Sequence, residues 1–355
     1  MKLIERSQSV FKWLASTPAR LPSRLEIPNE RIDNPDKLGP TLAKDKCYFQ
    51  VRVNEMFLAN KRQWFKTFYP MVYVGTEFQY DREEVAIPFV LGPNTIKSAI
   101  DPSTKNVVFK NTRVAGVSPY RGGRLTVTLI LYRVTENNYA RGLLNMVENL
   151  AGSLDFATSL SVYTKIAGAV LDGMETLSAS EDSQPILGHR MEFDPDAGDT
   201  LKPGYFVFVD MDRAELDRYE LWVKDDSLMH GPSLETAQPF RDADYVLTSL
   251  TARPERSDVN MLPFAEVWDR VIKEAAIPRV KNFKSAKANM ASLYQTMLLS
   301  PDLIEDHAMN LSTGYMERMV KVHEHARAIS NLDDAEAEAD QMDKLRDASL
   351  KILDL

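Results

Sequence analysis

Aspartates spaced one residue apart are the residues in this sequence best arranged for metal chemistry. Such pairs occur at Asp194/Asp196 and Asp210/Asp212, and Asp199 follows the first pair closely. Calcium takes about six to eight oxygen ligands, and loops at one end of a β-sandwich can supply several carboxylates. The five aspartates are therefore candidate calcium ligands. Aspartates also end strands by forming Asx-turns, which is the alternative structural role for the same residues.

Histidines are the second residue type that could act in a reaction. His323 and His325 lie two residues apart on a predicted helix, so they point about 200° apart and cannot hold one metal ion together. We expect both to be solvated at the surface. His189 lies in a predicted strand and would serve as a general base if a nucleophile stood opposite it, but the sequence identifies no such nucleophile.

Motifs that announce a known chemistry are absent from the chain. The sequence contains no phosphate-binding G-x-x-x-x-G-K-[ST], no G-x-G-x-x-G, no G-x-S-x-G, no H-E-x-x-H and no C-x-x-C. The sequence therefore favours a protein without enzymatic activity and without a cofactor other than calcium. A hydrolase built from scattered Asp, Glu and His residues is the enzymatic alternative.

Two helical stripes could bind a partner. Residues 3–15 have helical periodicity, with Phe11 and Trp13 on the apolar side. Near the C-terminus, apolar residues recur at steps of three and four, which is typical of a short coiled-coil seam that includes Tyr315, Met319 and Val322. These stripes predict a protein partner or a homo-oligomer.

The composition limits the classes of partner. The 355 residues carry a net charge of −8, which disfavours general binding to nucleic acid. Cys47 is the only cysteine, which fits a reducing compartment, so we expect a cytoplasmic protein. No apolar run approaches the roughly 18 residues of a transmembrane helix. Contact of the N-terminal helix with a membrane surface is the remaining membrane alternative.

The predicted strands and helices determine where all of these residues lie. Runs rich in Val, Tyr, Phe and Thr predict strands, the strongest of which are Cys47–Met56, Met71–Tyr80, Val85–Leu91, Arg124–Val134, Ile186–Phe193, Tyr205–Met211 and Tyr245–Ala252. Helical periodicity interrupts them at residues 137–179 and returns after Pro263. There the sequence predicts one helix that follows Ser300-Pro301-Asp302 and a separate final helix at about 334–354.

The predicted fold class is α+β. We expect an N-terminal helix and Pro-rich arm at residues 1–40. An antiparallel β-sandwich-like domain follows at 41–256, with an inserted helical hairpin at 137–179, and a C-terminal helical bundle occupies 257–355. Two small β domains on either side of the hairpin are the alternative arrangement.

The function that these features favour is a non-enzymatic scaffold or adaptor that mediates protein–protein interaction within a larger assembly. The alternatives are the hydrolase described above and a β-sandwich module that binds calcium or a membrane surface.

Overall fold

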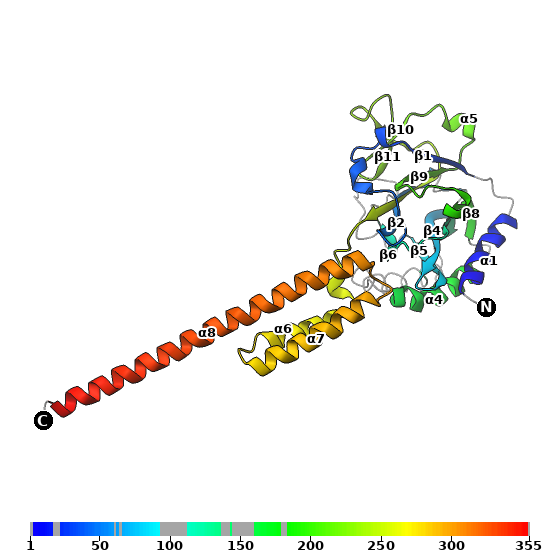
Figure 1. The fold of residues 1–355 in the computed structure, drawn as a ribbon. Coiled ribbons are helices and arrows are strands. Elements are labelled where there is room, and N and C mark those ends of the chain that lie inside the picture. The colour runs from blue at the N-terminus through cyan, green and yellow to red at the C-terminus, as the bar shows by residue number, and fades with distance from the viewer. Residues whose placement is uncertain are drawn as a thin grey trace. The chain divides into compact units, whose positions relative to one another are not determined.

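Antiparallel sheets and helices make up the fold, and three of the helices follow one another at the C-terminal end of the chain (Figure 1). This arrangement confirms the predicted α+β class. The computed structural model describes residues 3–16, 22–59, 62–63, 66–92, 112–135, 143, 160–178 and 183–353. The chain divides into two compact units, Met1–Met261 and Leu262–Leu355, called here the β unit and the helical unit. The domain limits expected at residues 40 and 256 stay predictions.

The first sheet of the β unit combines strands that are distant in the sequence. Its five strands run in the order β1-β9-β13-β2-β6, and each pairs antiparallel with its neighbours. The strands are β1 (Ser23–Ile27), β9 (Gly204–Val209), β13 (Tyr245–Arg253), β2 (Tyr48–Phe57) and β6 (Thr112–Pro119). The edge strand β1 comes from the Pro-rich stretch that the sequence predicted as an arm. The strand itself contains no proline, and Pro22 precedes it while Pro28 follows it.

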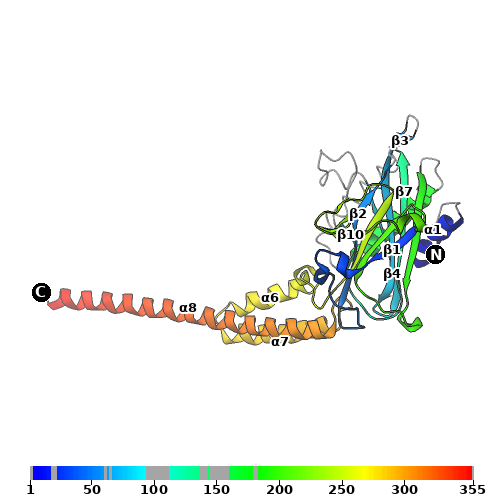
Figure 2. The same cartoon turned by 90° about the horizontal axis from the view of Figure 1, so that it is seen from above.

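The second sheet is built around two long strands that lie side by side (Figure 2). These are β4 (Lys66–Tyr80) and β7 (Leu125–Thr135), and β5, β8 and the short β3 pair with them. The added strands are β5 (Glu83–Leu91), β8 (Ser183–Phe193) and β3 (Arg62–Gln63). β7 precedes the predicted hairpin in the sequence and β8 follows it, and these two strands pair with each other in this sheet.

The main core lies where the side chains of the two sheets meet. Phe49 of β2 meets Phe78 of β4 edge to face, with ring centroids 4.9 Å apart. Phe193 of β8 meets Phe206 of β9 at 5.8 Å. These contacts bring both sheets into one apolar cluster of buried residues. Burial of this apolar surface drives the pairing of the sheets.

A second, smaller core lies on the other face of the first sheet. Alternation along β9 divides its side chains between the two cores, since Phe206 and Phe208 enter the main core and Tyr205, Val207 and Val209 enter the second. A three-stranded sheet, α5 and the short helices η1 and η2 belong to this region. Their bounds are β10 (Leu221–Lys224), β11 (Ser227–His230), β12 (Gln238–Pro239), α5 (Arg213–Leu216), η1 (Asn29–Arg31) and η2 (Pro35–Leu38). Two further short helices are η3 (Pro195–Ala197) and η4 (Val259–Met261).

Helices α1 (Leu3–Ser16) and α4 (Leu160–Ser178) pack on the second sheet and on each other (Figure 1). The Ser7 hydroxyl lies 3.1 Å from the Tyr73 hydroxyl of β4, and the Arg6 guanidinium pairs with Asp172 and Glu175 of α4. The second helix of the predicted hairpin is therefore α4. Except for Leu143, the rest of the 137–179 prediction up to residue 159 lies outside the described residues, as does its end at 179.

The helical unit contains α6 (Ala265–Ala275), α7 (Val280–Leu298) and α8 (Glu305–Leu353), which contact one another. The helix α8 is 49 residues long and continues past α6 and α7 (Figure 1). The predicted break before a final helix at 334 is wrong, because α8 runs through it. Residues 330–334 contain neither glycine nor proline, the two residues that oppose helical backbone most strongly.

Candidate functional site

The first group of candidate calcium ligands surrounds η3, in the turn between β8 and β9. Asp194 Oδ1 accepts a hydrogen bond from the Asp196 backbone N–H at 3.0 Å, and Asp199 Oδ2 accepts one from the Asp194 N–H at 3.0 Å. Arg124 also pairs with Asp194 at 3.3 Å. Carboxylates used in this way stabilise a turn, as in the Asx-turn alternative.

The second group, Asp210 and Asp212, lies at the other end of β9. The strand β9 has six residues, so roughly 20 Å of extended chain separates the second aspartate group from the turn that holds Asp199. The structure therefore does not bring the five aspartates together. The described part of the chain contains no group of three or more His, Cys, Asp or Glu side chains placed to hold a metal ion. Calcium binding stays a prediction.

Buried carboxylates in the β unit each meet an arginine, and all three pairs join segments far apart in the sequence. They are Glu55 with Arg241 at 2.9 Å, Glu77 with Arg190 at 3.0 Å and Asp244 with Arg133 at 3.0 Å. Desolvation raises the pKa of Glu55, although Arg241 and the Leu228 N–H oppose that shift. An arginine beside each carboxylate offsets the free energy of burying its charge, so these pairs are suited to holding strands together.

The helical unit contains the predicted seam residues and packs them inward. Tyr315 of α8 stacks on Trp268 of α6, with ring centroids 4.0 Å apart and planes 8° from parallel. Met319 is buried, and Val322 is partly buried. Phe11 and Trp13 lie in α1, but their side chains are outside the described residues. An intermolecular role for these five residues stays a prediction.

One histidine prediction is wrong. His323 is buried, and its Nδ1 lies 3.0 Å from the Ala275 carbonyl oxygen. His325, two residues further along α8, is exposed as expected. The two side chains leave the helix in different directions, and only His323 is buried against α6 and α7.

An apolar groove of about 610 Å³ runs between α7 and α8 and is called here the methionine groove. Its lining residues are Lys287, Met290, Ala291, Tyr294, Met309, Ser312, Thr313, Met316, Met319 and Val320. Met290 and Met319 form a buried floor, whereas Met309 is 47% and Met316 is 45% exposed. Methionine is flexible and polarisable, so it adapts to the irregular apolar surface of a binding partner.

One cation, Lys287, lines the methionine groove on the α7 side. Helix α7 carries Lys281, Lys284 and Lys287 and has no acidic residue. All three lysines are exposed. An acidic flank on a bound segment would therefore be attracted to this edge.

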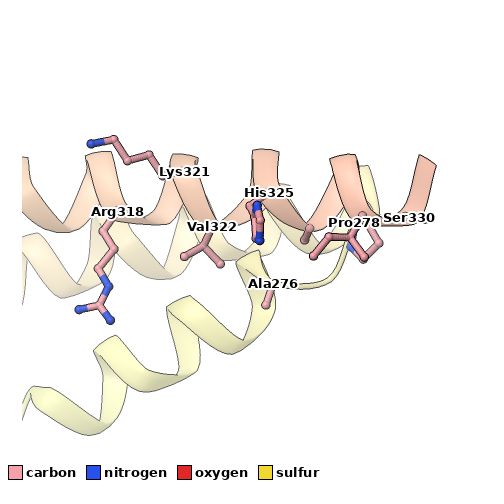
Figure 3. A pocket seen from close by; sticks show the side chains of 9 residues that line it. Ala276, Pro278, Arg318, Lys321, Val322, His325 and Ser330 are labelled. Carbon is pink, nitrogen blue, oxygen red and sulfur yellow. The ribbon is translucent and has the colours of Figure 1, made fainter. Parts of the chain in front are cut away.

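A second hollow, of about 630 Å³, lies between α8 and the end of α6 and is called here the basic pocket (Figure 3). Its lining residues are Ala276, Pro278, Arg318, Lys321, Val322, His325, Ala326, Ile329 and Ser330. Arg318, Val322 and His325 extend from α8 on the side of α6, whereas Lys321 leaves the helix in the other direction (Figure 3). The floor is apolar, and both charged lining residues, Arg318 and Lys321, are cations.

The sequence patterns predicted neither hollow, although the residues of the methionine groove carry a pattern that could have indicated it. Met309, Met316 and Val320 recur at steps of seven and four, which places them on one side of α8 next to the predicted seam. A second apolar stripe beside the first one is the signal that would have indicated a groove.

No protein-family model, curated protein or solved structure matches this chain. Among the helices in the described ranges, none combines the length and the hydrophobicity that crossing a bilayer requires.

Proposed function

We propose that this protein is a non-enzymatic, cytoplasmic scaffold or adaptor that binds another protein through its helical unit. The observation that carries the proposal is the exposed methionine groove. Large exposed apolar side chains gathered in a groove are typical of interaction sites, because a partner that covers them removes apolar surface from water.

The geometry of the groove favours a helical ligand. Two helices form its walls, and a third helix packs well between two others when its side chains enter the space between their ridges. We therefore propose an amphipathic helix of a partner protein, with apolar residues at steps of three and four. The lysines of α7 favour a partner helix whose flank is acidic.

Co-purification from cells that naturally make the protein tests the proposal. The wild-type chain is compared with Met316→Glu, which places a charge in the groove, and with Met261→Glu. Met261 is 41% exposed and does not line the groove, so this control makes the same chemical change at a residue outside the groove lining. We expect a stoichiometric partner with the wild type and with Met261→Glu, identified by mass spectrometry and at least about tenfold depleted with Met316→Glu.

A direct binding measurement completes the test. The partner found in this way is purified, and its affinity for the three chains is measured by calorimetry. If no protein accompanies the wild-type chain in stoichiometric amount, or if Met316→Glu binds the partner as tightly as Met261→Glu does, the proposal is wrong.

A further inference from the structure

The charges on α8 are separated along the helix, on either side of its middle residue. Residues 318–329 hold three cations, Arg318, Lys321 and Arg327, and one carboxylate, Glu324. Residues 331–340 hold five carboxylates and no lysine or arginine. Those carboxylates are Asp333, Asp334, Glu336, Glu338 and Asp340. A basic segment is thus followed directly by an acidic one.

The middle residue of α8 lies at the boundary between the two segments. Ile329 is 47% exposed and lines the basic pocket. It is also the central residue of the helix, which runs from Glu305 to Leu353. An antiparallel pair of α8 helices with its two-fold axis at Ile329 would therefore place the acidic segment of each copy along the basic segment of the other.

The register of such a pair matches individual charges. Steps of three and four place positions 318, 325, 329, 336 and 340 on one face of α8. About an axis at residue 329, Arg318 lies opposite Asp340 of the other copy, whereas Val322 lies opposite Glu336. The pairing therefore joins Arg318 with Asp340 twice, once at each end of the central segment. A parallel pair in register would instead align the five carboxylates with their own copies, which is repulsive.

The length of α8 gives a second reason to expect a partner there. The basic pocket ends at Ser330, where α8 passes the turn between α6 and α7. About 23 residues of helix follow, or ~34 Å (Figure 1). In proteins, most of the stability of a helix comes from tertiary packing of one of its faces.

We propose that two copies of this chain bind each other through antiparallel α8 helices centred on Ile329, with the acidic segment of each copy seated along the basic pocket of the other. The inference rests on the proposed function, because it names a second copy as one partner of the helical unit. It uses the basic pocket and not the methionine groove, so the two proposals fail separately.

Charge exchange in the full-length chain tests the register. Sedimentation velocity should show twice the 40.2 kDa mass of one chain. Arg318→Glu should weaken the dimer about tenfold, because it replaces two attractive pairs by two repulsive ones. The double variant Arg318→Glu/Asp340→Lys should recover to within about threefold of the wild type. Arg270→Glu is the matched control, because Arg270 of α6 is exposed, lies outside the basic segment of α8 and does not line the pocket, and it should leave the dimer unchanged within about threefold.

Cross-linking tests the direction of the helices. Ser330→Cys lies beside the axis and should form an intermolecular disulfide under mild oxidation. Thr313→Cys lies about 48 Å from its own copy in an antiparallel pair and should not form one. A wild-type chain that is monomeric at micromolar concentrations overturns the proposal. So does a dimer that Arg318→Glu leaves unchanged, one that the double variant fails to restore, or one cross-linked equally at both positions. In each of these cases, a partner bound at the methionine groove would remain as a separate result.

Discussion

The imidazole ring of His323 lies flat on the phenyl ring of Phe283, with ring centroids 4.0 Å apart and planes 3° from parallel. The same imidazole reaches the Ala275 carbonyl oxygen at the end of α6. On Phe283 itself, the Lys287 ammonium lies 4.6 Å from the ring centroid. The His323 side chain of α8 therefore contacts both α6 and α7.

Removing this contact should destabilise the helical unit. We expect His323→Ala to lower the free energy of unfolding by about 1–3 kcal/mol, because it empties a buried site and leaves the Ala275 carbonyl without this partner. His325→Ala is the control, since His325 is exposed on the same helix, and it should change stability by less than about 0.5 kcal/mol. Urea unfolding followed by circular dichroism measures both. Equal effects of the two substitutions would contradict the packing of His323.

Two glycines of α4 should respond in opposite directions to the same substitution. A Cβ on Gly173 would lie 2.4 Å from Leu143 Cδ1, whereas a Cβ on Gly168 would have no atom within 4 Å. Gly168→Ala should raise the free energy of unfolding by up to about 1 kcal/mol, because alanine favours helix over glycine. Gly173→Ala should lower it, because Leu143 must move. Thermal unfolding of the two variants checks the difference, and a stabilising Gly173→Ala would show that Leu143 does not pack there.

His189 should make the β unit less stable in acid. Burial, followed by the charge of Arg24, lowers the pKa of His189, whose ring packs on Phe208 at 5.1 Å. As the pH falls below about 6.5, the unfolded chain takes up this proton before the folded chain does. The stability that depends on neutral His189 is therefore present above that pH and is lost as the pH falls through the lower pKa of the folded state.

His189→Gln should remove this part of the pH dependence. Urea unfolding of both chains at pH 7 and pH 5 measures it, since any loss of ring packing affects the variant at both pH values and cancels in the difference. The wild type should lose more stability than His189→Gln between the two pH values. A variant that loses as much as the wild type would refute the prediction.

Cys47 should be inert in the folded protein. Burial raises the pKa of its thiol, and Sγ lies 3.5 Å from the Ala43 carbonyl oxygen. Both the small thiolate fraction and the lack of access slow attack on a disulfide reagent. We expect labelling by Ellman's reagent at pH 8 to be at least about 100-fold slower in the native chain than in urea. Rapid labelling of the native chain would instead indicate an accessible, reactive thiol.

Local sequence patterns predicted most of the long strands and helices. The run that forms β7 alternates small polar and large apolar residues, and the structure places it at the centre of the second sheet. By contrast, β1 and β11 were missed, because each is short and owes its extended backbone to hydrogen bonds with a neighbouring strand. Those partners, β9 and β10, are recognised only once the chain has folded.

The candidate site was predicted in part, for a similar reason. The seam through Tyr315 and Met319 was visible as apolar residues at steps of three and four, but the pattern cannot say whether a partner helix belongs to the same chain. Trp268, which belongs to the same helical unit, covers Tyr315. The exposed apolar side chains of α8 are instead those of residues such as Met309 and Met316.

The sequence by itself determined the α+β class and the apolar stripe through Tyr315 and Met319, because these depend on residues close together in the chain. Only the tertiary structure decided that His323 is buried while His325 is exposed, that Glu55 meets Arg241, and that two hollows flank α8. Burial and ion pairing join residues from distant segments, and no local pattern specifies which segments will meet.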